Sequence, residues 1–281
     1  MSTSTNTTQP DETKTTPLSR GEIFRKHRRK KVKRFGKLLI RRLAGFLGRQ
    51  SLIEDVPVID KALFPQIKAF EDNCREIRSE LDEILKHRDA VPLFQEISRD
   101  QHRIAKDDNW RTFILFGFGG KSEKNCRQAP VTARLLETVP NLQSAWFSII
   151  SPGYHIPPHR GVTKGILRCH LGLIVPADAE NCWMRVDDQV CVWKEGEAFV
   201  FDDTYEHEVC NNTEEDRVVL IFDFDRPMRL AGRLFNATFI ALLKMTAYYQ
   251  GPKKAMRTYE DRFEAAVRQA EQDVERLADD D

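Results

Sequence analysis

The sequence predicts a mainly β fold, a jelly roll of the double-stranded β-helix type with support helices at its flanks. From Ala145 to Phe224, short apolar runs follow one another and are separated by turn residues. Many short strands at regular spacing are typical of a β-sandwich or a jelly roll. His159 and His207 each lie at the end of a predicted strand, and this placement favours the double-stranded β-helix.

The individual strands are bounded by turn signals such as Pro152-Gly153 and Asn211-Asn212. An earlier strand is predicted at Trp110 to Phe118, where aromatic and aliphatic residues alternate with others before Gly119-Gly120 turns the chain. The later runs that we interpret as strands are 146–150, 167–175, 182–186, 190–193, 198–201, 208–210 and 218–224.

Helices are predicted on both sides of this β region. Apolar residues recur at helical spacing from Asp60 to His87, which indicates a helix that covers the sheet. A short helix is predicted at Pro130 to Thr138, since proline favours a first turn. The apolar stripe from Leu234 to Tyr248 predicts a support helix, with a second membrane contact as the less favoured alternative. The charged segment Tyr259 to Leu277 predicts a terminal arm or a partner helix.

A chain of 281 residues fits one large domain with appendages. Residues 1–19 are rich in Ser and Thr and poor in apolar residues, so we expect disorder. Residues 20–50 form a basic amphipathic arm. Residues 51–250 form the folded domain, with its β core at about 110–227. Residues 251–281 form a charged C-terminal helix.

The arm carries thirteen Lys or Arg residues and a single acid between Arg20 and Arg49. Its apolar positions 35, 39, 43, 46 and 47 share one helical face, a pattern that suits an anionic membrane surface. Two alternatives stay open: a solvated arm whose Leu and Phe side chains dock on the domain, and an arm that binds nucleic acid. The net charge of +1 disfavours nucleic acid as a partner of the whole chain.

Cysteine usage and hydropathy indicate the compartment. The six cysteines are widely spread, with no CxxC pair, which favours reduced thiols over disulfides or a zinc site. No run of about 20 apolar residues exists, so no ordinary transmembrane helix is predicted. We therefore expect a cytoplasmic protein, and the arm leaves open a peripheral attachment at the inner face of the membrane.

Three residues carry the expected chemistry. Two histidines on separate strand ends, His159 and His207, suit a non-haem iron site with open positions for O2 and substrate. Arg217 follows on the last strand, and its guanidinium could grip a 2-oxo acid carboxylate through a planar two-point bond. The alternative for Arg217 is a structural salt bridge with Glu206, Glu208 or Asp223.

Three motifs resemble the aspartyl/asparaginyl β-hydroxylase family of 2-oxoglutarate oxygenases. They are PGYHIPPHRG at 152–161, LRCHLGLIVP at 167–176 and EGEAFVFDDTYEHEV at 195–209. The resemblance spans roughly Trp110 to Pro227. It implies a cupin-like double-stranded β-helix, Fe(II) at His159 and His207, and 2-oxoglutarate held by Arg217. Further positions that match contacts of the 2-oxo acid are Ser148, Arg168 and His170.

Gly161 departs from the general iron oxygenase pattern, in which a His-x-Asp pair would place a carboxylate there. Lipid A hydroxylases that resemble this chain carry the Asp, whereas the animal aspartyl hydroxylase has Gly. We expect water at the vacant metal position, with Asp202 or Asp203 as an outer base that orients it.

The resemblance implies a hydroxylase that converts 2-oxoglutarate to succinate and inserts one oxygen atom into an aliphatic C–H bond. We expect its substrate to be an Asp or Asn residue of a peptide or of a carrier-bound small molecule. Two alternatives remain: a lipid acyl chain at the membrane, which the basic arm favours, and a jelly-roll module that binds metal or acid without turnover.

Overall fold

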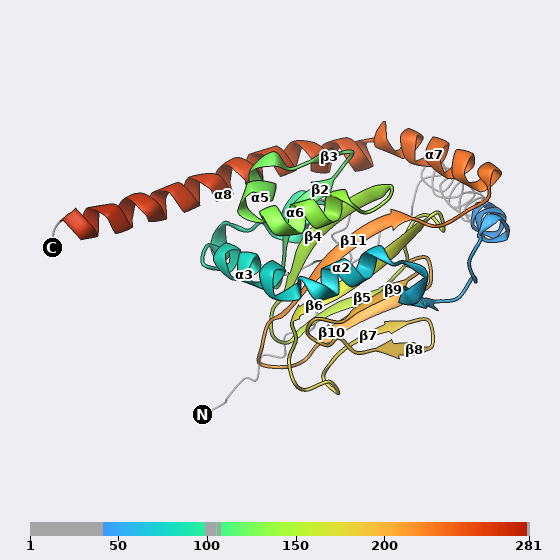
Figure 1. The fold of residues 1–281 in the computed structure, drawn as a ribbon, viewed down its shortest axis with the longest axis horizontal. Helices are drawn as coiled ribbons and strands as arrows, with labels where there is room; N and C mark the ends of the chain where they lie inside the picture. The colour runs from blue at the N-terminus through green and yellow to red at the C-terminus, as the bar shows by residue number, and fades with distance from the viewer. Residues whose placement is uncertain (1–41, 99–104, 106–107, 280–281) are drawn as a thin grey trace, which may run out of the picture. The chain divides into compact units, whose positions relative to one another are not determined.

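Two facing antiparallel sheets form the centre of the computed structural model, which describes residues 42–98, 105 and 108–279 (Figure 1). In the described chain the larger sheet has the order β1-β9-β6-β11-β4-β2-β3, and the smaller sheet has the order β5-β10-β7-β8. Every pairing between these strands is antiparallel. This arrangement, with its flanking helices, confirms the predicted double-stranded β-helix.

Eight strands correspond to predicted runs to within a few residues, whereas β1, β3 and β5 have no predicted counterpart. The larger sheet consists of β1 (Val58–Ile59), β9 (Ala198–Phe201), β6 (Ile166–Ile174), β11 (Arg217–Asp225), β4 (Leu142–Ile150), β2 (Trp110–Gly117) and β3 (Gly120–Lys121). The smaller sheet consists of β5 (Tyr154–His159), β10 (His207–Asn211), β7 (Cys182–Val186) and β8 (Gln189–Cys191).

Strand β11 lies near the middle of the larger sheet and is buried on both faces. Because side chains alternate along a strand, Val218, Leu220 and Phe222 point to one face, and Arg217 and Val219 point to the other. Val218, Leu220 and Phe222 belong to the apolar cluster under the helices. Val219 belongs to the cluster between the two sheets. Strand β11 therefore has one face in the main apolar core and the other face toward the interior between the two sheets.

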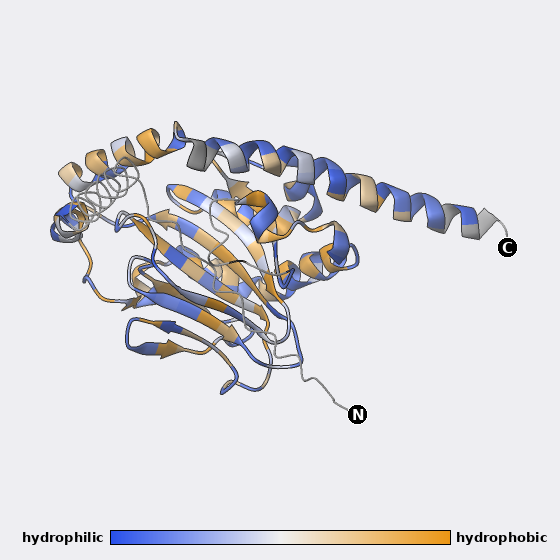
Figure 2. Ribbon diagram, turned by 180° about the vertical axis from the view of Figure 1, so that it is seen from behind, coloured by the Kyte–Doolittle hydropathy of each residue, from blue (hydrophilic) through white to orange (hydrophobic). Residues whose placement is uncertain are grey.

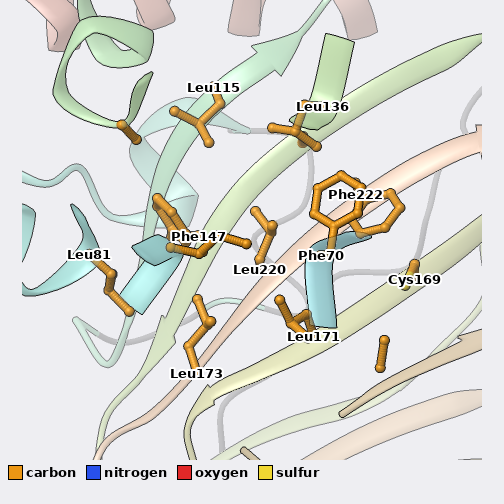
Figure 3. Packing of buried hydrophobic residues seen from close by; sticks show 14 of the residues in the cluster. Phe70, Leu81, Leu115, Leu136, Phe147, Cys169, Leu171, Leu173, Leu220 and Phe222 are labelled. Carbon is orange, nitrogen blue, oxygen red and sulfur yellow. The ribbon is translucent and has the colours of Figure 1, made fainter. Parts of the chain in front are cut away.

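The outer face of the larger sheet is covered by helices (Figure 1). Figure 3 shows Phe70 and Leu81 of the helices against Phe147, Leu220 and Phe222 of the sheet. The rings of Phe70 and Phe222 stack with centroids 4.6 Å apart. The covering helices are α2 (Gln66–Asp72), α3 (Cys74–Leu85) and α6 (Pro130–Glu137), with the short elements η1 (Lys61–Leu63), η2 (Arg88–Ala90), α4 (Phe94–Ile97) and α5 (Glu123–Gln128) beside them.

The predicted single helix from Asp60 to His87 is wrong in detail, because the structure divides it into η1, α2 and α3. Pro65 is the N-cap of α2, where a proline is tolerated. At Asn73 the backbone leaves the helical region, and its side-chain amide donates to the carbonyl of Ala69 at 2.8 Å. The same carbonyl also accepts from the Asn73 backbone N–H at 3.2 Å, so the side-chain bond adds to the backbone bond that ends α2.

Strand β5 was not predicted, because Pro157-Pro158 reads as a break in a strand. It pairs with β10 as the edge strand of the smaller sheet. The register shifts between His207 and Val209: His207 pairs with His159, whereas Val209 pairs with Ile156. A bulge of one residue in β5 at the prolines explains this shift, and proline is accepted at bulges and edges.

The C-terminal part consists of α7 (Leu230–Lys244) and α8 (Ala247–Asp279), and α8 starts before the predicted boundary at 251. Phe263 of α8 is 2 % exposed, and its ring packs edge-on against Phe113 with centroids 4.8 Å apart. This part of α8 is therefore a wall of the domain. The division at 250 stays a prediction, and so does a partner for the distal end of the helix.

The predicted disorder at 1–19 and the arm up to residue 41 lie outside the described residues. Residues 42–50 are helical, Leu47 is buried, and the Phe46 ring lies 5.4 Å from that of Phe235. These two apolar positions of the arm therefore dock on the domain. Within the described ranges, no helix combines the length and the apolar character that a bilayer crossing requires.

Phe263→Ala should lower the free energy of unfolding by about 3–5 kcal/mol, because it leaves a cavity between α8 and the sheet. Urea unfolding followed by far-UV circular dichroism measures the change. Gln269→Ala, on the exposed side of the same helix, should stay within about 0.5 kcal/mol of the parent protein. Equal stability of the two variants would mean that α8 does not form part of the core.

Candidate active site

A cavity of about 490 Å³ lies between the inner face of the larger sheet and the His-bearing strands of the smaller one. All six predicted site residues line it: Ser148, His159, Arg168, His170, His207 and Arg217. They come from five strands, β4, β5, β6, β10 and β11. The fold thus brings together the whole set, although its members are spread over some 70 positions of the sequence.

The two histidines face each other across the bulged pair of strands. Their ring centroids are 4.1 Å apart. Nδ1 of His159 lies 2.9 Å from the carbonyl of Pro157, and Nδ1 of His207 lies 2.9 Å from the carbonyl of Tyr205. Because a carbonyl only accepts, each Nδ1 carries the proton, and each Nε2 keeps a lone pair for a metal.

Burial keeps both histidines neutral. It lowers the pKa of His159, and it lowers the pKa of His207 to about 3, with the nearby His159 adding to the effect. A metal ligand must be unprotonated, so these two side chains are ready to bind a divalent cation near neutral pH. Their donor atoms suit Fe(II), for which imidazole is a common ligand.

The space beside Gly161 is filled by the carboxylate of Asp203. A Cβ atom on Gly161 would lie 2.0 Å from Asp203 Oδ1, and the Gly161 N–H donates to the Asp203 carbonyl at 2.6 Å. Burial raises the pKa of the Asp203 carboxyl to about 7, and Arg168 Nη2 lies 3.7 Å away. In the described chain no group of three His, Cys, Asp or Glu side chains has the arrangement of a metal site. The protein therefore offers two histidine ligands, with a carboxyl group close by.

Asp202, the neighbour of Asp203, has a different role. Its carboxylate pairs with the fully buried Arg226, lies 3.0 Å from Lys164 Nζ, and accepts from the Thr204 N–H at 2.9 Å. These contacts stabilise a turn before His207. They also occupy Asp202, so of the two candidates for an outer base, Asp203 is the one beside the histidines.

Arg217 is a buried cation, 1 % exposed, at the inner end of β11. Its guanidinium lies over the Trp193 ring at 4.5 Å from the centroid. Among the described residues, no hydrogen-bond acceptor reaches its Nε or Nη1. Burial lowers its pKa to about 10, so it stays charged near neutral pH. A charge in this position needs an anionic partner.

The acids that could have paired with Arg217 are bound elsewhere. Glu208 Oε1 accepts from Arg185 Nε at 2.6 Å, and its Oε2 lies 2.8 Å from His155. Glu206 lies near exposed arginines, 3.8 Å from Arg185. Asp223 binds Arg168. The salt-bridge alternative for Arg217 is therefore wrong.

His170 and Ser148 add further donors to the same interior. The His170 Nδ1 accepts from Trp193 Nε1 at 3.3 Å, so its Nε2 carries a proton, which meets no acceptor in the described part of the chain. The Ser148 hydroxyl accepts from Trp110 Nε1 at 3.1 Å, which leaves its own hydrogen to donate. Together with Arg217, these groups form a donor set for a buried anion.

Arg168 is held in place by Asp223. Its Nε and Nη2 donate to the two carboxylate oxygens at 2.7 and 2.9 Å, in a two-point bond. Its guanidinium also lies 5.2 Å from the centroid of the Trp146 ring. Arg168 lines the cavity as expected, and its contact with a 2-oxo acid stays a prediction.

One side of the cavity is apolar, a feature that the sequence did not reveal. Phe94 stacks on Trp110 with centroids 3.8 Å apart. Ile114 lies beyond them, packed with Trp146 and with Met256 of α8. Trp146 thus connects the apolar side with the polar set at Arg168. His155, by contrast, does not line this cavity: it lies in β5, where its Nε2 is 2.8 Å from Glu208 Oε2.

The fold and the site define a class, because a double-stranded β-helix that carries a histidine pair and a buried arginine is the framework of 2-oxoglutarate oxygenases. The sequence profile of the family "Aspartyl/Asparaginyl beta-hydroxylase" matches residues 71–227, more than half of the chain. The chain belongs to the aspartyl/asparaginyl β-hydroxylase family, and it is a hydroxylase of the 2-oxoglutarate oxygenase class. Membership implies dependence on Fe(II) and 2-oxoglutarate.

Curated relatives fall into two groups. The chain is 43 % identical over 209 residues to an ornithine lipid ester-linked acyl 2-hydroxylase of Rhizobium tropici, and the match covers 74 % of each protein. It is 35 % identical over 166 residues to the human aspartyl/asparaginyl β-hydroxylase, a match that covers 57 % of this chain and 21 % of the human protein.

Solved structures similar to the chain include cupin domains. A cupin 2 conserved barrel protein of Salinispora arenicola matches with a TM-score of 0.30 at 14 % identity, over 50 % of this chain and 92 % of that one. A Cupin_2 domain of an Enterobacter cloacae transcriptional regulator matches with a TM-score of 0.29 at 12 % identity, over 41 % of this chain and 96 % of that one.

Gly161→Ala should lower the free energy of unfolding by about 1–3 kcal/mol, because the added methyl group meets the Asp203 carboxylate. Thermal or urea unfolding measures the loss. Gly120→Ala is the matched control, since no atom lies within 4 Å of the Cβ position there. In an Asp203→Ala background, the penalty of Gly161→Ala should disappear. Additive effects in this double-mutant cycle would contradict the contact.

Proposed function

We propose that this protein hydroxylates C2 of an ester-linked acyl chain of a membrane lipid, with Fe(II), 2-oxoglutarate and O2. The observation that carries the proposal is the division of the cavity into a polar and an apolar part that meet at Trp146. The similarity to the Rhizobium protein, whose name gives that reaction, supports the same substrate class. The proposal takes the lipid alternative in place of an Asp or Asn residue of a peptide.

In this proposal His159 and His207 hold the iron through Nε2. The carbonyls of Pro157 and Tyr205 fix both rings, so little rotamer freedom is lost when the metal binds. With Fe(II) bound, the site supplies the oxidising chemistry: 2-oxoglutarate and O2 give succinate and CO2, and one oxygen atom enters the substrate C–H bond. Asp203 fills the space at Gly161 and is placed to accept a hydrogen bond from a water near the histidines.

Arg217 holds the distal carboxylate of 2-oxoglutarate in our proposal. A dicarboxylate in the cavity satisfies the free Nε and Nη1 of Arg217, and it offers acceptors to the Ser148 hydroxyl and the His170 Nε2–H. This removes the cost of a buried cation without a counter-ion. The role of Arg168 beside them is to keep the local charge balanced through its pair with Asp223.

The apolar part of the cavity takes the acyl chain. Phe94, Trp110, Ile114 and Trp146 present aromatic and aliphatic surface with few polar atoms, which suits methylene groups and not a peptide carboxylate. C2 of an acyl chain is the carbon next to the ester carbonyl. A chain that lies along this wall therefore brings the reacting carbon to the boundary between apolar and polar parts, beside the histidines.

Arg217→Lys should weaken 2-oxoglutarate binding by about five- to a hundred-fold, because an ammonium group cannot reproduce the two-point bond. Anaerobic titration of the Fe(II)-loaded protein, followed by its visible charge-transfer band, measures the dissociation constant. Arg185→Lys is the matched control, because Arg185 binds Glu208 on the same sheet as the histidines. Its dissociation constant should not change.

Iron affinity separates the roles of the two kinds of residue. Arg217→Lys should bind Fe(II) as tightly as the parent protein does in the absence of 2-oxoglutarate, whereas His207→Ala should lose it. An unchanged 2-oxoglutarate dissociation constant in Arg217→Lys would exclude the role given to Arg217. Iron bound at parent affinity in His207→Ala would exclude the histidine pair.

The substrate class is tested by anaerobic loading with Fe(II) and 2-oxoglutarate, followed by O2 and a candidate substrate. An ester-linked acyl lipid such as ornithine lipid should give succinate and a 2-hydroxy fatty acid, which mass spectrometry detects after ester hydrolysis. An Asp-containing peptide should give neither product. Succinate with the peptide and none with the lipid would assign the chain to the other substrate class.

Ile114→Trp tests the apolar wall, because the larger ring fills the space that the chain would use. Turnover of a long-chain lipid should fall by about ten-fold or more relative to a short-chain one. The 2-oxoglutarate dissociation constant should stay unchanged. Val190→Trp, on exposed β8, is the control and should leave the ratio unaltered. An unaltered ratio of long-chain to short-chain turnover in Ile114→Trp would mean that the acyl chain does not bind along this wall.

A further inference from the structure

Helix α7 presents large apolar side chains to solvent. Leu230, Leu234, Leu242 and Met245 are 67, 61, 59 and 78 % exposed. At 100° per residue, Leu230, Leu234 and Met245 lie on one stripe of the helix, and Leu242 borders it. Figure 2 shows the contrast between α7, which is mostly hydrophobic in colour, and the mainly hydrophilic α8. Contiguous exposed apolar surface of this kind marks an interaction site.

The charges on α7 have one sign. The helix contains Arg233 and Lys244 and no Asp or Glu, and Arg229 is its N-cap. At helical spacing Arg233 and Lys244 fall on the same border of the apolar stripe. An acidic side chain near both Arg233 and Lys244 is Asp225, which accepts a hydrogen bond from the Gln143 side chain at 2.8 Å. An apolar stripe with a basic border is the pattern of a helix that lies in the surface of an anionic membrane.

The opposite side of α7 is tied to the rim of the active-site cavity. Asn236 is buried, where its Nδ2 donates to the Gly165 carbonyl at 3.1 Å and its Oδ1 accepts from the Thr163 hydroxyl at 3.1 Å. Thr163 lines the cavity, and so do Gly161 and the half-exposed Val162. Helix α7, which carries the exposed stripe, is therefore fixed to the cavity rim by the hydrogen bonds of Asn236.

We propose that the exposed face of α7, defined by Leu230, Leu234, Leu242 and Met245, docks on an anionic lipid bilayer. Docking places the apolar side chains among the acyl chains and Arg233 and Lys244 at the headgroups. It brings the cavity rim at Val162 and Thr163, which lies against the opposite side of α7, to within one helix diameter, about 10 Å, of the bilayer. This inference rests on the proposed lipid substrate, since a membrane lipid has to reach the cavity without crossing water.

The test compares Leu234→Gln/Met245→Gln with the full-length parent protein in co-sedimentation with vesicles made of equal parts phosphatidylcholine and phosphatidylglycerol. The partition coefficient should fall about 10- to 100-fold, because two side chains lose the apolar area that they would bury. The control pair Leu63→Gln/Val190→Thr removes similarly exposed side chains outside α7 and should leave partitioning unchanged. An unchanged coefficient in the α7 variant would overturn the proposal.

Arg233→Gln tests the electrostatic part. It should weaken binding to the mixed vesicles about five-fold, and it should have no effect on vesicles of phosphatidylcholine alone. High salt should reduce the effect, since the Debye length falls from about 10 Å at 0.1 M to about 3 Å at 1 M. An equal loss on both kinds of vesicle would overturn the role given to the basic border.

Hydrogen exchange of the full chain, with and without the mixed vesicles, identifies the surface that docks. Added protection in 230–245 supports the proposal. Protection confined to residues 1–41 would assign binding to the arm and overturn it. Light scattering that shows a dimer, converted to a monomer by Leu234→Gln/Met245→Gln, would make the face a contact between two copies and overturn it as well.

Failure of this proposal is distinguishable from failure of the proposed function. Hydroxylation of a short-chain lipid in detergent does not require docking, so the α7 variant should match the parent protein in that assay. Loss of vesicle binding with this turnover intact supports docking. If vesicle binding and turnover are both unchanged, docking on α7 is rejected, and the proposal of a lipid substrate still stands.

Discussion

The structure depends on a buried guanidinium, whose Nε and Nη1 meet no hydrogen-bond acceptor in the part of the chain that the structure describes. Arg217 stands at the end of a strand whose other residues are almost entirely buried, and its ring partner Trp193 offers a π face and no counter-ion. Leaving a guanidinium there is costly unless an anion joins it. The neighbouring acids each lie against another basic side chain, which supports our proposal that a carboxylate from outside joins Arg217.

The position of the histidine pair depends on a local irregularity in the pairing of β5 with β10. Two prolines force a bulge in β5, and the bulge brings His159 opposite His207 at the end of both strands. Gly161, two residues further on, leaves room for a carboxyl group that belongs to a different segment, Asp203. An acidic side chain thus lies close to the histidine pair, and it is supplied by the strand connection before His207.

Much of this fold could be predicted from the sequence, because buried strands such as Cys182–Val186 and Ala198–Phe201 appear as apolar runs between turn residues. The six site residues could be predicted through motifs. Strand β5 could not, since proline normally ends a strand, and neither could the division between α2 and α3, since the helical spacing of apolar residues continues through Asn73. The Gly161–Asp203 contact arises from tertiary packing, which no local pattern encodes, and so does the absence, among the described residues, of an acceptor for Nε and Nη1 of Arg217.

Family membership alone does not select the substrate, because the curated relatives include both lipid and Asp/Asn hydroxylases. In our proposal the histidines and Arg217 serve the steps common to the class. The choice of substrate must therefore come from surfaces outside that set: the wall formed by Phe94, Ile114 and Trp146, and the exposed face of α7. Both are apolar; the wall lines the cavity, whereas α7 contacts the cavity rim through its opposite side, at Asn236. An acyl chain that leaves a bilayer is a ligand that both surfaces would favour at once.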